Sequence, residues 1–272
     1  MDARLQRRVQ RYGWDKAAGC YEQYWADQLA PAQDRVLALA ALQPGDRVLD
    51  VACGTGLVTV RAAEAVGRTG RVLATDLSGL MVERLRDTVA ARGLTQVGVQ
   101  QCDAEALPID DADFDAALCA LGLMYVADPV VALRHMYRAL DPPGRVVIAV
   151  WGARARCGWA EVFPIVERRV ASEVCPLFFQ LGTGDTLAHE LGRVAFTDVH
   201  IERIATTLRY DSGDAACGAA FAGGPVALAY SRFDPGTRAA VHEEYLASIA
   251  QFRSGPGYDI PGEFVVARGW RR

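Results

Sequence analysis

The chain has 272 residues, of which 51% are hydrophobic and 23% charged, and its formal net charge is −4. It is long enough to bury a large core, either as one elaborated domain or as a domain with a smaller subdomain. The negative charge and the lack of a long basic run argue against nucleic acid as a partner. The apolar runs are far shorter than a membrane span, and no secretory leader is evident. We expect a cytoplasmic protein, monomeric or homodimeric.

Seven cysteines are scattered along the chain, without a CxxC pair or a histidine at zinc-ligand spacing. This pattern is typical of reduced thiols rather than of a disulfide framework. Structural zinc sites need ligands at characteristic spacings, which the sequence does not offer. We therefore expect no metal site.

The first 43 residues have helical patterns, which end at the Pro-Gly turn of residues 44–45. Tyr21, Tyr24 and Trp25 fall on one face of the second helical stretch. An aromatic stripe of this kind packs in a core or forms a lid whose aromatic face closes over a ligand. Residues 1–43 are expected to form N-terminal lid helices, with both interpretations of the stripe left open.

Residues 44–152 alternate between apolar strand patterns and helical patterns. Strands are predicted at 47–51, 71–75, 97–101, 114–119 and 145–151, with helices at about 57–66, 79–92 and 129–140 between them. This alternation predicts a Rossmann-like, doubly wound α/β sheet of mostly parallel strands. Right-handed crossovers then bring the carboxyl ends of the strands, and any ligand, to one edge.

The rest of the chain loses the alternation and regains it near the end. Residues 153–195 are rich in aromatic residues, proline and glycine, and are expected to form a helical cap insertion. Residues 196–272 are expected to complete the sheet with strands at 197–204 and 263–268. A second helical insertion is expected between these strands, at about 211–255.

The turn after the first predicted strand is the most informative stretch. Residues 48–56 (VLDVACGTG) have the composition of a strand, a tight turn and the start of a helix. Glycine there lets a ligand approach the backbone. Asp76 ends the next strand, twenty residues past Gly56, and a carboxylate there can accept hydrogen bonds from both hydroxyls of a ribose. The glycine-containing turn and Asp76 together predict a site for a nucleotide-like ligand.

Four segments in this region resemble the class I S-adenosylmethionine-dependent methyltransferases, and among them the group related to the ubiquinone/menaquinone biosynthesis C-methyltransferases. The segments occur in the family's order and near its spacing: residues 48–56 (VLDVACGTG), 74–81 (ATDLSGLM), 102–108 (CDAEALP) and 114–119 (FDAALC). The resemblance covers about residues 44–152. It implies a seven-stranded sheet with an antiparallel last strand, the cofactor S-adenosyl-L-methionine and the product S-adenosyl-L-homocysteine.

The resemblance also implies roles for the turn and for the fourth strand. The backbone at Ala52, Cys53 and Gly54 would pass the methionine part of the cofactor, and the Cys119 carbonyl would face its amino group. Ala52 stands where many family members have a first glycine.

The resemblance assigns further roles to the second and third strand ends. Asp76 would bind the ribose hydroxyls, with Leu77 beside the adenine and Met81 near the same pocket. Asp103 and the Ala104 amide would contact the adenine amino group and a ring nitrogen. Two structural alternatives remain: Asp76 as an acid at a helix N-terminus, and Asp103 as a helix cap.

The segment after the fourth strand constrains the acceptor. Residues 119–122 (CALG) offer backbone and apolar surface, without the motifs of nucleic-acid, arginine or catechol methylation. We therefore expect a small, largely apolar or aromatic acceptor, methylated at oxygen, carbon or nitrogen. Tyr21, Trp25 and Tyr125 are candidates for the acceptor pocket, and no catalytic residue is assigned.

Two other functions are weighed against methyl transfer. A short-chain nicotinamide-dependent oxidoreductase needs a Tyr-x-x-x-Lys pair, and the chain's single lysine is Lys16. A non-catalytic or regulatory protein that binds the cofactor is the second alternative, because binding does not guarantee turnover.

Overall fold

The computed structural model describes residues 3–109, 112–170, 175 and 177–272. Its centre is a twisted sheet with the strand order β3-β2-β1-β4-β5-β8-β6. The first five strands are parallel, and β8 pairs in the antiparallel sense with β5 and β6. The predicted mostly parallel sheet with an antiparallel last strand is therefore confirmed.

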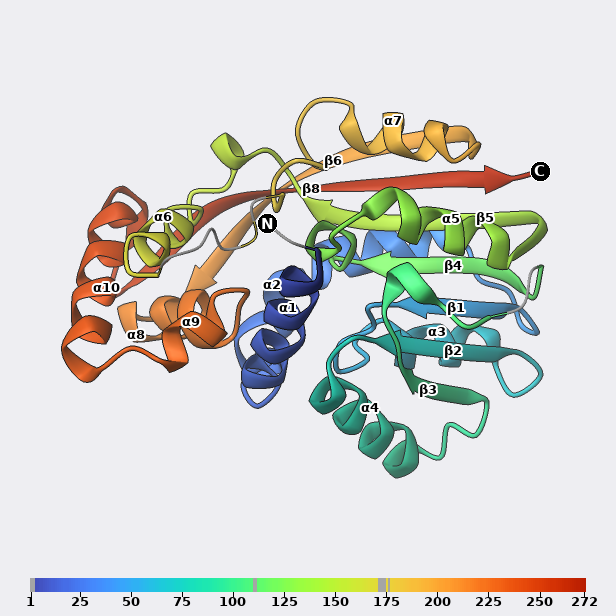
Figure 1. Ribbon diagram of the computed structural model, residues 1–272, viewed down its shortest axis with the longest axis horizontal. Helices are drawn as coiled ribbons and strands as arrows, with labels where there is room; N and C mark the ends of the chain where they lie inside the picture. Colours follow the sequence, from blue (N-terminus) through green and yellow to red (C-terminus); the bar gives the residue numbers. More distant parts are fainter. Residues whose placement is uncertain (1–2, 110–111, 171–174, 176) are drawn as a thin grey trace.

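Four of the five strands in the amino-terminal half begin and end within one residue of their predicted positions, whereas β5 begins five residues earlier than predicted. They are β1 (Arg47–Val51), β2 (Arg71–Asp76), β3 (Val97–Gln101), β4 (Phe114–Ala120) and β5 (Leu140–Trp151). β1 and β4 are buried along most of their length, because helices cover both faces of the sheet. α3 (Thr59–Val66) lies behind the sheet and α5 (Pro129–Ala139) in front of it, whereas α4 (Gly79–Arg92) packs on β2 and β3 (Figure 1).

The first two helices approach the sheet in different ways. α2 (Tyr21–Ala40) packs its buried residues against β4, β5, β6 and β8. α1 (Ala3–Ala17) stands beside the carboxyl ends of β1 and β4 (Figure 1). It contacts α4 on one side and α9 (Ala227–Ser231) on the other, so it spans the edge of the sheet where a ligand site was predicted.

The last two long strands extend beyond the rest of the sheet. β6 (Thr197–Tyr210) and β8 (Gly257–Arg271) pair up to Tyr210 and Tyr258, whereas β5 pairs with β8 only as far as Phe264. Figure 1 shows a helical lobe at the end of this ribbon. The lobe contains α6 (Val162–Glu167), α8 (Gly213–Cys217), the π-helix η4 (Gly218–Ala222), α9 and α10 (Pro235–Ser248).

The remaining elements are short. α7 (Thr186–Arg193) packs on β6, the two-residue β7 (Arg253–Ser254) pairs with β8, and the single-turn 3-10 helices are η1 (Ala104–Ala106), η2 (Leu123–Tyr125), η3 (Arg154–Arg156) and η5 (Ala250–Phe252). Within the predicted cap at 153–195, residues 171–174 and 176 lie outside the described residues. In the described ranges, no helix combines the length and the apolar character that crossing a bilayer requires.

Candidate active site

The turn after β1 has a left-handed backbone at three positions. Ala52, Gly54 and Gly56 have φ angles of 56°, 57° and 97°. Glycine adopts this conformation readily, whereas alanine is strained by about 1 kcal/mol. A Cβ atom at Gly56 would also lie 2.2 Å from a methyl carbon of Leu85, so the turn packs on α4 only without a side chain there. The left-handed conformation at Ala52 explains why glycine suits this position.

Asp76 ends β2 and faces this turn. Its Oδ2 accepts a hydrogen bond from the Gly54 amide at 2.9 Å, and its Oδ1 accepts one from the Ser78 amide at 2.8 Å. Burial raises the pKa of Asp76 to about 6, against the lowering effect of these hydrogen bonds. The N-cap of α4 is Ser78, whose Oγ accepts from the Met81 amide. Each oxygen of Asp76 therefore retains acceptor capacity for a ligand hydroxyl.

Asp50, on β1, is a second buried acid beside the turn. Its side chain accepts a hydrogen bond from the Thr59 hydroxyl at 2.6 Å. Burial, with a smaller contribution from the nearby Asp76, raises the pKa of Asp50 to about 7, against the lowering effect of the hydrogen bond from Thr59. Two neighbouring carboxylates of this kind make the local potential negative above neutral pH.

Asp103 begins the turn after β3 and has two partners. Its Oδ1 accepts a hydrogen bond from the Glu105 amide at 2.9 Å, so it caps the short helix η1, as one of the two interpretations expected. Its Oδ2 lies 3.0 Å from Nε of Arg7, on α1. The same Arg7 nitrogen lies 2.8 Å from Oε2 of Glu105, whose side chain is 4% exposed. An ion-pair cluster thus joins α1 to the edge of the sheet.

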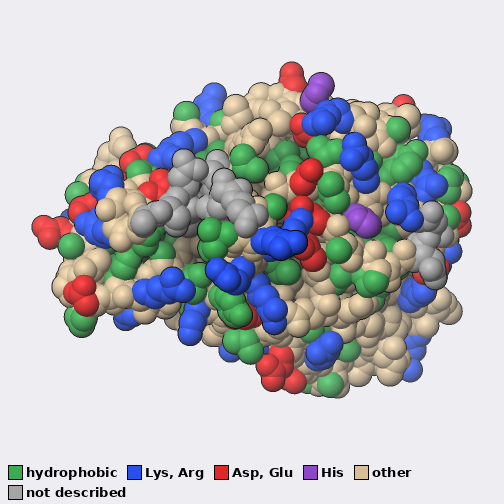
Figure 2. All heavy atoms as spheres, in the orientation of Figure 1, with side chains coloured by type: hydrophobic (Ala, Val, Ile, Leu, Met, Phe, Trp, Pro, Cys, Tyr) green, Lys and Arg blue, Asp and Glu red, His purple; other side chains and the backbone are tan. Residues whose placement is uncertain are grey.

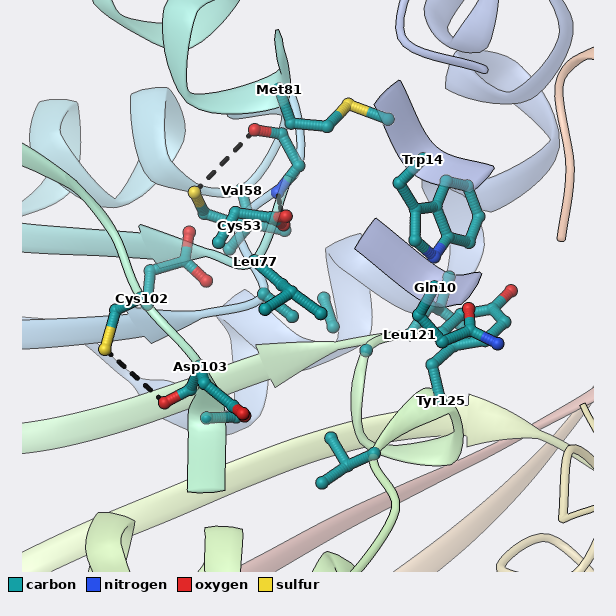
Figure 3. A pocket seen from close by; sticks show the side chains of 18 of the residues that line it. Gln10, Trp14, Cys53, Val58, Leu77, Met81, Cys102, Asp103, Leu121 and Tyr125 are labelled. Carbon is teal, nitrogen blue, oxygen red and sulfur yellow. Dashed lines mark hydrogen bonds between the residues drawn. The ribbon is translucent and has the colours of Figure 1, made fainter. Parts of the chain in front are cut away.

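These residues surround a pocket of about 950 Å³, counting its open mouth. Its walls come from α1, the turn after β1, the ends of β2 and β3, and the segment after β4 (Figure 3). Figure 3 shows Gln10 and Trp14 on the same side as Tyr125, opposite Cys102 and Asp103. We call this cavity the first pocket.

The first pocket brings together most of the predicted site residues. Its lining includes Ala52, Cys53, Gly54, Asp76, Leu77, Met81, Asp103, Ala104, Tyr21 and Tyr125. Cys119 is 1% exposed and does not line it, although the next residue, Ala120, does. Burial raises the pKa of Cys119 to about 12 and that of Cys53 well above its ordinary value, so neither thiol is an activated nucleophile.

Several lining residues were not predicted. The most notable are Arg7, Gln10 and Trp14, which sit three and four residues apart on α1 and so share one face. This spacing was visible in the sequence, but the three side chains are partly polar and partly aromatic and so do not resemble a buried apolar stripe. Gly122 was also missed; a Cβ atom there would lie 2.3 Å from Cβ of Ala52, so glycine lets the two turns meet.

A second, smaller cavity adjoins the first pocket and is almost entirely aromatic or aliphatic. We call it the aromatic pocket; it occupies about 330 Å³. Its lining residues are Trp14, Tyr21, Trp25, Leu29, Leu121, Met124, Tyr125, Trp151, Trp159, Phe178, Gly224 and Pro225. Trp25, Trp151 and Trp159 contact one another edge to face, with ring centroids 4.9 to 6.3 Å apart. Trp25 therefore lines this cavity instead of the first pocket.

Comparison with known families covers the part of the chain that supplies most residues of the first pocket. Residues 48–144 match the family described as "Methyltransferase domain". The ubiquinone/menaquinone biosynthesis C-methyltransferase UbiE of Xanthomonas campestris pv. campestris is 44% identical over 110 residues, which are 40% of this chain and 44% of that protein. Residues 48–144 therefore form a methyltransferase domain that is similar to those of class I S-adenosylmethionine-dependent enzymes. The UbiE protein of Teredinibacter turnerae is 41% identical over 113 residues, 41% of this chain and 45% of that one.

The methyltransferase domain thus accounts for part of the chain, which spans less than half the length of the curated relatives it matches. Solved structures agree on the fold over a longer stretch. YcgJ of Bacillus subtilis has a TM-score of 0.63 at 17% identity and covers 89% of this chain and 98% of that one. Phosphoethanolamine N-methyltransferase 2 of Haemonchus contortus has a TM-score of 0.62 at 16% identity, covering 95% of this chain and 58% of that one.

Proposed function

We propose that the protein transfers a methyl group from S-adenosylmethionine to a small, largely apolar or aromatic acceptor held in the aromatic pocket. The observation that carries this proposal is that the two cavities share a wall. The shared residues are Trp14, Tyr21, Leu121 and Tyr125. A reactive group in one cavity and a nucleophile in the other would meet at this wall.

The first pocket fits S-adenosylmethionine on two observations. Asp76 is buried at the end of β2 with unused acceptor capacity on both oxygens, which suits a pair of ribose hydroxyls. A Cβ atom on Gly54 would lie 3.9 Å from Cε1 of Tyr21, so the missing side chain keeps the gap between them open. Asp103, Leu77 and Met81 would hold the adenine side of the cofactor.

When bound, S-adenosylmethionine supplies an electrophilic methyl group on a positively charged sulfur. The chain's part is to hold the acceptor in line with that group and to exclude water. Asp50 and Asp76 provide negative charge near the turn, which favours a cationic ligand. α1 closes one side of the first pocket through Gln10 and Trp14.

The lining of the aromatic pocket supports the proposed class of acceptor. Among the described residues that line it, none is a carboxylate or a histidine. Burial raises the pKa values of Tyr21 and Tyr125 above the ordinary range, so both remain neutral phenols that donate hydrogen bonds. The pocket therefore suits an acceptor whose nucleophilic atom needs no strong base, at carbon, oxygen or nitrogen. The UbiE relatives carry out C-methylation by name, which makes carbon the first atom to test.

The proposal is tested first by calorimetric titration of the full chain with S-adenosylmethionine, S-adenosylhomocysteine and NADH. Micromolar binding of the two sulfur compounds without NADH is expected. Binding of NADH alone would refute the cofactor assignment. A panel of phenols, hydroquinones and aromatic amines is then incubated with methyl-labelled cofactor. Label transfer to a panel member supports the proposal, whereas tight cofactor binding without transfer to any member favours a regulatory protein.

A further inference from the structure

The outward face of α1 carries an exposed apolar stripe. In the described part of the chain, the exposed large hydrophobic residues are Leu5, Tyr12 and Leu80, with 38%, 49% and 46% of their surface accessible. Leu5 and Tyr12 are seven residues apart, so they lie on one face of the helix. Leu80 is adjacent to α1, because its amide donates to Oδ1 of Asp15 at 3.2 Å. All three exposed large hydrophobic residues of the described chain therefore lie on or beside α1, instead of being scattered singly over the surface.

Basic side chains flank this stripe. Arg4, Arg8, Arg11 and Lys16 are all exposed on α1, within the same half of its circumference as Leu5 and Tyr12. Figure 2 shows basic and apolar side chains gathered over the position of α1. Asp15, the acid of this helix in the described residues, is turned toward α4, where it accepts a hydrogen bond from the Ser78 hydroxyl at 2.6 Å. The exposed acid Glu83 borders the stripe on α4. We call this surface the α1 patch: Arg4, Leu5, Arg8, Arg11, Tyr12, Lys16 and Leu80.

We propose that the α1 patch docks the protein on an anionic lipid surface. An amphipathic helix with apolar residues between cations lies in the interface of such a surface, with its apolar side chains below the headgroups. Charge complementarity supports this occupant, because four cations stand against acidic headgroups. The apolar stripe between them distinguishes the patch from a site built for phosphate contacts alone.

Two other occupants fit less well. A nucleic acid would gain little from exposed leucine and tyrosine side chains, and the chain as a whole has a net charge of −4. A second copy in a two-fold dimer would bring together two patches of the same positive charge, which repel each other.

The opposite face of the same helix lines the first pocket. Arg7, Gln10 and Trp14 reach inward from α1, whereas Leu5 and Tyr12 point away from the core. Docking through the outer face therefore holds the helix that closes the pocket against the surface. This inference does not depend on methyl transfer, because it concerns the outer face of α1 only.

The test is co-sedimentation of the full chain with two kinds of vesicle. One kind contains phosphatidylcholine alone, and the other contains about 40% phosphatidylglycerol, which makes its surface strongly anionic. Binding to the anionic vesicles, little binding to the neutral ones and release at high salt are expected. Failure to bind the anionic vesicles at low salt would overturn the proposal.

Two double variants separate the charged and apolar contributions. Arg8→Gln with Arg11→Gln is expected to lower partitioning about 25-fold, since each cation near such a surface contributes about fivefold. Leu5→Ser with Tyr12→Ser is expected to lower it about tenfold through lost apolar contact. Unchanged partitioning of the apolar variant would contradict insertion of the stripe.

A matched control removes the same charge elsewhere. Arg68 and Arg232 are exposed and lie outside the α1 patch, so Arg68→Gln with Arg232→Gln is expected to bind like the parent protein. An equal loss in this control would show a non-specific charge effect and would refute the patch. Tighter binding to a duplex oligonucleotide than to anionic vesicles, lost in the Arg8/Arg11 variant, would assign the surface to nucleic acid instead. Circular dichroism confirms that each variant is folded.

Discussion

The guanidinium of Arg7, on the first helix, lies 3.0 Å from the carboxylate of Asp103, at the turn after β3. This contact joins a helix near the start of the chain to the residue expected to hold the adenine group. Because Arg7 also binds Glu105, one side chain fixes α1 across the mouth of the first pocket.

Replacing Arg7 with Met should loosen α1 over the pocket. Arg7 is 37% exposed, so solvent screening limits its contribution to about 1 kcal/mol or less, which corresponds to up to about fivefold in a rate or affinity. We expect faster hydrogen exchange in residues 3–17 and dissociation of S-adenosylmethionine up to about five times faster in stopped-flow measurements. Arg35→Met is the matched control, because the Arg35–Glu202 pair has similar exposure but lies between α2 and β6. Equal exchange of α1 in both variants would show that Arg7 does not hold the helix.

Replacing Asp76 with Ala should weaken binding of S-adenosylmethionine about 10- to 100-fold, about 1.5–3 kcal/mol, through loss of charge-assisted hydrogen bonds. Calorimetric titration measures this change. Asp87→Ala, at an exposed position on α4, is the control and should bind like the parent protein. An unchanged dissociation constant for Asp76→Ala would remove this carboxylate from the ribose site.

Binding of S-adenosylmethionine should also strengthen as the pH rises from 5 to 8. Burial raises the pKa of Asp76 to about 6 and that of Asp50 to about 7. Both groups are protonated at pH 5 and ionised at pH 8, and the ionised forms attract a cation and accept hydroxyl donors more strongly. The apparent midpoint reflects both carboxylates, since they interact. In Asp76→Asn the lower part of this titration should disappear; a flat profile in the parent protein would contradict the expected role of the two acids.

Replacing Trp159 with Leu should change acceptor binding but not cofactor binding. Trp159 lines the aromatic pocket and not the first pocket. We expect the KM for an acceptor found in the panel to rise about tenfold, from lost aromatic contact area, with an unchanged dissociation constant for S-adenosylmethionine. Phe196→Leu is the control, because Phe196 is equally buried but lines neither pocket. A parallel rise in both variants would point to general destabilisation.

The parallel half of the sheet was predictable because its inner strands carry nearly continuous apolar runs. β1 has its predicted bounds, and β2 and β4 each extend one residue beyond theirs. β6 and β8 were predicted too short, at 197–204 and 263–268, whereas they span Thr197–Tyr210 and Gly257–Arg271. Their outer halves pair with each other beyond the end of β5, and in β8 this part contains Gly257, Pro261 and Gly262, residue types that weaken a strand prediction.

The candidate site was predictable where a local motif specifies backbone geometry. The turn at Ala52 and Gly54 and the acid at Asp76 belong to such motifs. The contact of Arg7 with Asp103 spans almost a hundred residues of sequence, and the face of α1 that it belongs to carries Gln10 and Trp14 rather than a continuous apolar stripe. Only the folded chain brings these groups together, which is why α1 was expected as a lid but its contacts were not.

The ribbon formed by β6 and β8 has a consequence for how acceptor choice can change. Most residues of the aromatic pocket lie outside residues 48–144, and Gly224 and Pro225 come from the lobe at the ribbon's end. Apart from α6, that lobe is inserted between β6 and β8, at the far side of the sheet from β1 and β2, which position Asp50 and Asp76. Insertions and replacements there would reshape the aromatic pocket without rebuilding the turn after β1. Under the proposed function, acceptor preference can thus diverge among chains that share this turn.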